Sequence, residues 1–108
     1  MVEELSPTEV AARVKANPKG VLLLDVREPN ERELAHIEPS LFIPMREVPN
    51  RLEEIPKDRE VVVYCHGGAR SAMIAGFLES RGYARVANLS GGIDAWSRTV
   101  DPKVPRYD

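Results

Sequence analysis

The only cysteine of the chain, Cys65, lies in a segment whose residue types suit nucleophilic chemistry. It directly follows the β-branched run 61–64 and precedes the glycine pair 67–68 and then Arg70. If that run is a strand and a helix starts near Ser71, the thiol lies past the carboxyl end of a strand, where α/β sheets bind ligands. The glycines let the backbone curl, so that successive N–H groups can point into one concavity. The pattern predicts a nucleophile at the floor of an anion-binding loop.

Two positive features beside Cys65 favour its thiolate form. The helix expected from about Ser71 directs the positive end of its dipole at the loop, and Arg70 adds a full charge. A lone cysteine is commonly just a small buried hydrophobe, so the thiol by itself would indicate little. Its place between a strand and a glycine-containing loop favours a functional thiol. The residues expected to bind substrate around it are His66, Gly67, Gly68, Ala69, Arg70 and Ser71.

The segments that must position this loop alternate between short apolar runs and helical patterns, which is typical of an α/β domain with a parallel sheet. Apolar runs predict strands at 21–24, 41–43, 61–64 and 86–89. A capping box at Ser6 predicts a first helix, and further helices are expected at 29–34, weakly at 48–55, from about 71 to 81, and ending at Trp96.

The helix after the cysteine loop carries apolar residues at helical spacing, which we interpret as core rather than as a cofactor site. These residues are Met73, Ile74, Phe77 and Leu78, and Trp96 is expected to anchor the last helix by packing. A length of 108 residues predicts one domain, 1–108, with a core over about 5–97 and an extended tail over 98–108.

Composition and charge exclude several classes of function. A formal net charge of −2 with scattered Lys and Arg does not suggest nucleic acid or an anionic membrane surface as a partner. No apolar run approaches the length of a membrane span, and the acidic segment 1–5 is not a signal peptide. With one cysteine and no internal disulfide, we expect a cytoplasmic protein. The two histidines and the one cysteine lack the spacing of metal ligands, so we expect no metal site. The sequence contains no nucleotide-binding fingerprint, so we expect no cofactor.

Four motifs in order along the chain are similar to those of the rhodanese homology domain, from about Leu5 to Trp96. The segment 24–28, with Glu31 a turn later, resembles the first signature of that family. Residues 35–37 and 43–44 resemble its Gly-His-Ile and Ile-Pro stretch, although Ala35 replaces the usual glycine and Ser40-Leu41 replaces Gly-Ala. The loop 65–71 resembles Cys-x-x-Gly-x-Arg-Ser, and 89–96 resembles Leu-x-Gly-Gly-x-x-x-Trp.

The resemblance implies a three-layer sandwich with a central parallel sheet of about five strands flanked by helices. It also implies a sulfurtransferase that moves sulfane sulfur from a donor such as thiosulfate to a thiol or to cyanide through a persulfide on Cys65. The expected partners are a small-molecule sulfur donor and a thiol acceptor, including a thioredoxin-like protein. Four residues are expected to support the site, with Glu31 a partner for Arg27: Asp25, Arg27, Glu31 and His36.

Two other functions compete with sulfur transfer. A rhodanese-like domain can serve as a binding or regulatory module with a silent cysteine, but Cys65, both glycines and Arg70 are all retained here. A cysteine phosphatase or arsenate reductase is the other alternative. The loop from Cys65 to Arg70 has six residues, as in the sulfur-transferring members that it resembles, whereas the related phosphatases use a loop one residue longer.

Overall fold

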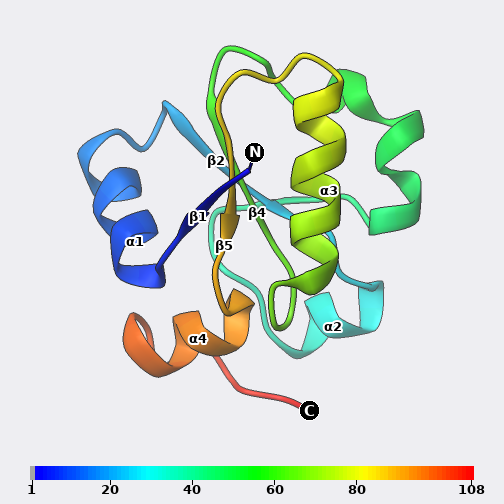
Figure 1. Cartoon of the computed structure of the whole chain (residues 1–108). Helices are drawn as coiled ribbons and strands as arrows, with labels where there is room; N and C mark the ends of the chain where they lie inside the picture. Colours follow the sequence, from blue (N-terminus) through cyan, green and yellow to red (C-terminus); the bar gives the residue numbers. More distant parts are fainter. Residues whose placement is uncertain (1) are drawn as a thin grey trace.

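The computed structural model describes residues 2–108 and contains a five-stranded sheet in which all neighbouring strands are parallel (Figure 1). The strands are β1 (Glu3–Leu5), β2 (Val21–Asp25), β3 (Leu41–Phe42), β4 (Glu60–Tyr64) and β5 (Val86–Leu89), in the order β1-β5-β4-β2-β3. The helices are α1 (Pro7–Ala16), α2 (Pro29–Leu34), α3 (Ala69–Ser80) and α4 (Gly92–Thr99), with 3-10 turns η1 (Met45–Asn50) and η2 (Leu52–Glu54).

Helices cover both faces of the sheet, and each face has its own apolar core. Along the central strand β4, Val61 and Val63 pack into the core beneath α3, while Val62 and Tyr64 pack into the core beneath α1 and α4. This alternation follows from the two-residue period of a strand that is buried on both faces. Trp96 is 8% exposed and packs into the second core, as predicted. The expected three-layer α/β architecture is confirmed.

Strand β1 was not predicted, because two of its three residues are exposed glutamates and only Leu5 is buried. It is added to the edge of the sheet by parallel pairing with β5. The stretch expected as a helix over 48–55 forms η1 and η2 instead. Pro49 lies inside η1, where the missing N–H is incompatible with a continuous α-helix.

Two further expectations need correction. Met73 is 66% exposed, so it does not belong to the core stripe of α3, to which Ile74 and Leu78 do belong. The boundary at residue 98 is also wrong, because α4 continues to Thr99, whose hydroxyl donates to the carbonyl of Ala95 at 2.7 Å. Helical spacing alone cannot tell which residues at the edge of an apolar stripe face solvent.

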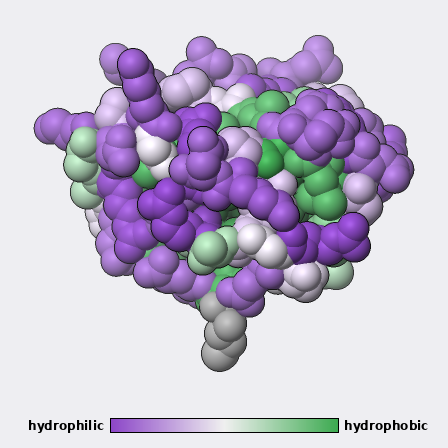
Figure 2. Space-filling model, turned by 90° about the horizontal axis from the view of Figure 1, so that it is seen from above, coloured by the Kyte–Doolittle hydropathy of each residue, from purple (hydrophilic) through white to green (hydrophobic). Residues whose placement is uncertain are grey.

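The carboxyl ends of β2, β4 and β5 meet at the end of the molecule that carries α2, α4 and the start of α3 (Figure 1). Figure 2 looks onto the other end, whose surface is mostly hydrophilic, with hydrophobic residues visible in a hollow on one side. Among residues 2–108, no helix combines the length and the apolar character that crossing a bilayer requires.

Candidate active site

Cys65 is the first residue after β4 and lies at the floor of the loop that leads into α3. The residue is 1% exposed, and its sulfur faces backbone donors. The N–H groups of Gly68 and Ser71 point at Sγ from 3.1 and 3.4 Å. Because N–H groups from a loop and a helix start stabilise negative charge, this arrangement suits a thiolate or a persulfide anion.

The orientation of the loop depends on the start of α4. The carbonyl groups of Cys65 and His66 accept hydrogen bonds from the N–H groups of Ile93 and Asp94, at 2.9 and 3.2 Å. A trans peptide unit is planar and its N–H points away from its C=O. The N–H groups that follow these two carbonyls, on His66 and Gly67, therefore point away from α4.

Glycine is required at two positions around this loop. Gly92 has φ +62°, and a Cβ there would lie 2.3 Å from the carbonyl oxygen of His66 and 2.5 Å from that of Cys65. Gly68 precedes α3 and has φ +111°, which strongly favours glycine. Gly67 is different, because it lacks a positive φ and a Cβ would meet open space. Of the glycine pair that was expected to let the backbone curl, Gly68 therefore has the conformation that favours glycine and Gly67 does not.

The side chain of Ser71 connects the cysteine to a buried amide that was missed in the sequence. Its Oγ lies 3.3 Å from Sγ, 3.2 Å from the carbonyl oxygen of Gly68 and 2.5 Å from Oδ1 of Asn88. The amide nitrogen of Asn88 in turn donates to both carboxylate oxygens of Glu4, at 3.0 and 3.1 Å. A polar residue in the middle of an apolar strand was the available signal.

Arg70 is bound by a carboxylate rather than left free. Its Nη1 and Nη2 donate to the two oxygens of Glu31 at 2.7 and 2.9 Å. The paired guanidinium lowers the pKa of Glu31 to about 2. Arg27 has Asp25 as its carboxylate partner and contacts only the backbone carbonyl of Glu31, so the expected pairing of Arg27 with the Glu31 carboxylate is wrong.

The pair formed by Asp25 and Arg27 is 0% exposed and fixes the loop after β2. Burial is the largest single influence on Arg27 and opposes its charge, but the hydrogen bonds that Arg27 makes with Asp25 and Tyr107 and the charge of Asp25 together outweigh burial and raise the pKa of the guanidinium. Arg27 also donates to the carbonyl of Ala35 at 2.7 Å. These contacts agree with a supporting structural role for both residues.

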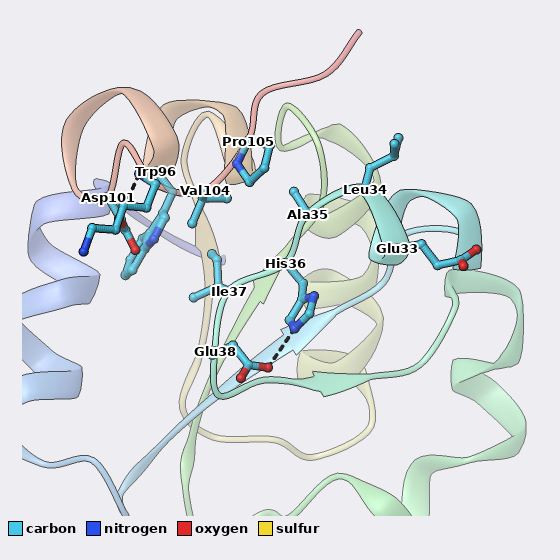
Figure 3. A pocket seen from close by; sticks show the side chains of 11 residues that line it. Glu33, Leu34, Ala35, His36, Ile37, Glu38, Trp96, Asp101, Val104 and Pro105 are labelled. Carbon is cyan, nitrogen blue, oxygen red and sulfur yellow. Dashed lines mark hydrogen bonds and ion pairs between the residues drawn. The ribbon is translucent and has the colours of Figure 1, made fainter.

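His36 does not reach the cysteine loop through any hydrogen bond. Its ring nitrogens lie 2.7 Å from a carboxylate oxygen of Glu38 and 3.3 Å from the carbonyl oxygen of Arg32. Figure 3 shows it lining an open groove of about 540 Å³ between the segment after α2 and the chain after α4. It therefore orders a turn beside the site.

A second missed residue is Tyr107, in the segment that follows α4. Its hydroxyl donates to Glu31 at 2.7 Å and accepts from Arg27 at 2.9 Å. Its ring centroid lies 4.4 Å from that of His66. Glu31 and Arg27 are 76 and 80 positions away from Tyr107 in the sequence, and His66 is also distant. No local pattern could therefore identify these contacts.

The comparisons with known proteins agree with this geometry. The model of the rhodanese-like domain matches residues 6–99. The chain belongs to the rhodanese-like family. A protein of Allochromatium vinosum named sulfurtransferase is 46% identical over 98 residues, which cover 91% of each chain. Membership of the rhodanese-like family and this relative support sulfur transfer in general as the activity.

Two solved rhodanese-like structures have the same fold. The crystal structure of reduced CoADR-RHD from Bacillus anthracis has a TM-score of 0.84 at 34% identity, covering 95% of this chain and 18% of that one. A rhodanese-like domain protein from Staphylococcus aureus has a TM-score of 0.82 at 27% identity, covering 99% of this chain and all of that one, 100%.

We predict that Gly92→Ala disrupts the loop, because the new methyl group must displace the carbonyl groups of Cys65 and His66. Chemical denaturation should show a loss of about 2 kcal/mol or more, as for other positions with a strained φ and a backbone clash. Gly76→Ala is the matched control: it lies within α3 with open space around it, and should stabilise by roughly 0.5–1 kcal/mol. Equal stability of both variants would contradict the proposed close approach.

The Glu31–Arg70 pair predicts a pH-dependent loss of stability. The pKa of Glu31 is about 2 in the folded chain against an ordinary value of 4.5, so the pair stabilises the fold above about pH 4.5 and loses its effect as the pH falls toward 2. At pH 7, Glu31→Gln should lower the free energy of unfolding by about 1–3 kcal/mol, and this difference should shrink below pH 4.5. Glu54→Gln, in an exposed pair with Arg51, should have a much smaller effect on the free energy of unfolding, because solvent screens an exposed ion pair. A difference that is independent of pH would contradict the ion pair.

Proposed function

We propose that this chain transfers sulfane sulfur from an anionic donor such as thiosulfate to a thiol or to cyanide, through a persulfide on Cys65. The observation that carries the proposal is the set of backbone donors that face Sγ, from Gly68 at 3.1 Å and Ser71 at 3.4 Å. The same donors can stabilise the thiolate and, after small adjustments, the charge on the outer sulfur of a persulfide.

The first step forms the persulfide. The Cys65 thiolate attacks the outer sulfur of thiosulfate, a new S–S bond forms, and the S–S bond of thiosulfate breaks. The electron pair of that bond leaves with sulfite. In the second step the acceptor attacks the outer sulfur of the persulfide, and the Cys65 thiolate leaves with the electron pair, so no other oxidant or reductant is needed.

Each loop residue has a role in this proposal. His66, Gly67 and Ala69 contribute backbone groups to the wall of the loop, and Gly68 and Ser71 supply the N–H groups nearest to Sγ. Arg70, whose side chain is 35% exposed, lies close enough to Cys65 for their charges to interact and attracts the anionic donor.

The six-residue loop favours sulfur over phosphate chemistry. Cys65 is 1% exposed, and the N–H of Gly68 and the hydroxyl and N–H of Ser71 already lie 3.1, 3.3 and 3.4 Å from its sulfur. A phosphoryl group, with three oxygens around the reacting atom, needs a wider ring of donors than one sulfur atom does.

We propose a cellular thiol as the acceptor, either a small molecule or a thioredoxin-like protein in the cytoplasm.

The test is the intact mass of the chain after incubation with thiosulfate. We expect the mass of one added sulfur atom, its loss on addition of cyanide or a thiol, and no added sulfur on Cys65→Ser. The mapping is unambiguous because Cys65 is the only cysteine.

Two results would contradict the proposal. Unmodified Cys65 across a panel of thiosulfate, persulfides and polysulfides would favour a binding module. Hydrolysis of an aryl phosphate by the wild-type chain, lost in Cys65→Ser, would favour a phosphatase.

A further inference from the structure

Tyr107 connects two ion pairs, one at the carboxyl end of β2 and one between α2 and α3. Its hydroxyl accepts from Arg27 Nη1 at 2.9 Å and donates to Glu31 Oε2 at 2.7 Å. Arg27 is bound to the buried Asp25, and Glu31 is bound to Arg70. A continuous chain of hydrogen bonds therefore runs from the end of β2 to the arginine of the Cys65 loop.

The directions of these bonds are fixed by chemistry. A guanidinium can only donate and a carboxylate can only accept, so the hydroxyl must accept from Arg27 and give its one proton to Glu31. Burial raises the pKa of Tyr107 to about 12, which keeps that proton in place at neutral pH. A phenylalanine at this position would keep the aromatic ring but could make neither the hydrogen bond with Arg27 nor the one with Glu31.

The Glu31 carboxylate has little freedom to turn. Besides the hydroxyl of Tyr107 it accepts two bonds from Arg70 and one from the backbone N–H of Glu28, at 3.0 Å. A carboxylate offers about four lone-pair sites, and these donors use them. Because the carboxylate holds both Nη atoms of Arg70, the orientation of the guanidinium depends on the group that holds the carboxylate.

The ring of Tyr107 contacts the same loop. It packs against His66, the residue after the cysteine, with the ring planes inclined by 59°. Together with Asp94 and Arg106, these two residues line an open recess of about 420 Å³. A residue distant in sequence thus packs against the residue next to Cys65.

We propose that Tyr107 is a positioning residue, which acts through Glu31 to fix the Arg70 guanidinium beside Cys65 and so selects reagents and sulfur donors that carry a negative charge. The inference deepens the proposed sulfur transfer, on which its role in catalysis rests. The placement of charge at Cys65 can nevertheless be measured without sulfur transfer.

Alkylation of the single thiol gives that measurement. In each reaction Sγ forms an S–C bond, the C–I bond breaks, and iodide leaves with the electron pair. Iodoacetate is an anion and iodoacetamide is neutral. The second-order rate constant for iodoacetate divided by that for iodoacetamide therefore reports the positive charge presented at Cys65. We expect Tyr107→Phe to lower this ratio roughly 3- to 10-fold, within the range for losing one ordinary hydrogen bond, and Arg70→Gln to lower it further.

Tyr83→Phe is the matched control. Its hydroxyl also makes two hydrogen bonds, to the carbonyl oxygens of Leu52 and Ile55 at 3.1 and 2.7 Å, but Tyr83 follows the far end of α3. This variant loses a comparable contact, so it reports the effect of a general loss of stability. We expect its alkylation ratio to equal that of the wild type at a temperature where all variants are folded.

A double variant tests the route through the carboxylate. In a Glu31→Ala background, Tyr107→Phe should cause no further change in the alkylation ratio, because the group through which it acts is gone. With thiosulfate as donor, Tyr107→Phe alone should raise KM by a factor similar to the change in ratio, with a smaller effect on kcat.

Three results would overturn the inference: an unchanged ratio in folded Tyr107→Phe, an equal fall in Tyr83→Phe, or a full effect of Tyr107→Phe in the Glu31→Ala background. Absence of a persulfide on the wild-type chain would instead refute the proposed function. In that case the alkylation ratios would still decide whether Tyr107 positions Arg70.

Discussion

The site depends on which way the peptide units of the loop after β4 face. The start of α4 binds the carbonyl groups of Cys65 and His66, so the N–H groups of those units point to the other side. This arrangement needs a backbone approach so close that Gly92 cannot carry a Cβ. The glycine pair 91–92, which resembles a family motif in the sequence, thereby serves the cysteine loop from another element.

Two carboxylates, those of Asp25 and Glu31, fix the arginines near the cysteine loop. Asp25 fixes Arg27 in the interior, and Glu31 fixes Arg70 at the edge of the loop. Each arginine is thus bound before any substrate arrives, which reduces the reorganisation that a reaction would require. Tyr107 connects the two pairs, and its ring packs against His66, the residue after Cys65.

The sequence predicted the features that depend on local patterns. The apolar runs gave β2, β4 and β5, and the Cys65 loop was correctly placed between a strand and a helix. The missed features depend on distant partners or on exposure. Strand β1 pairs with the edge strand β5, Arg70 pairs with Glu31 of α2, 39 positions away, and Met73 faces solvent at the border of an apolar stripe. Tyr107 had no local signal at all.

The most direct test of sulfur transfer by way of Cys65 is the release of sulfite in the absence of any acceptor. If Cys65 carries the sulfur as a persulfide, thiosulfate alone should yield a burst of sulfite equal in amount to the chain, and release should then stop until cyanide or a thiol is added. Release that requires the acceptor from the start, or that persists in Cys65→Ser, would contradict the persulfide account.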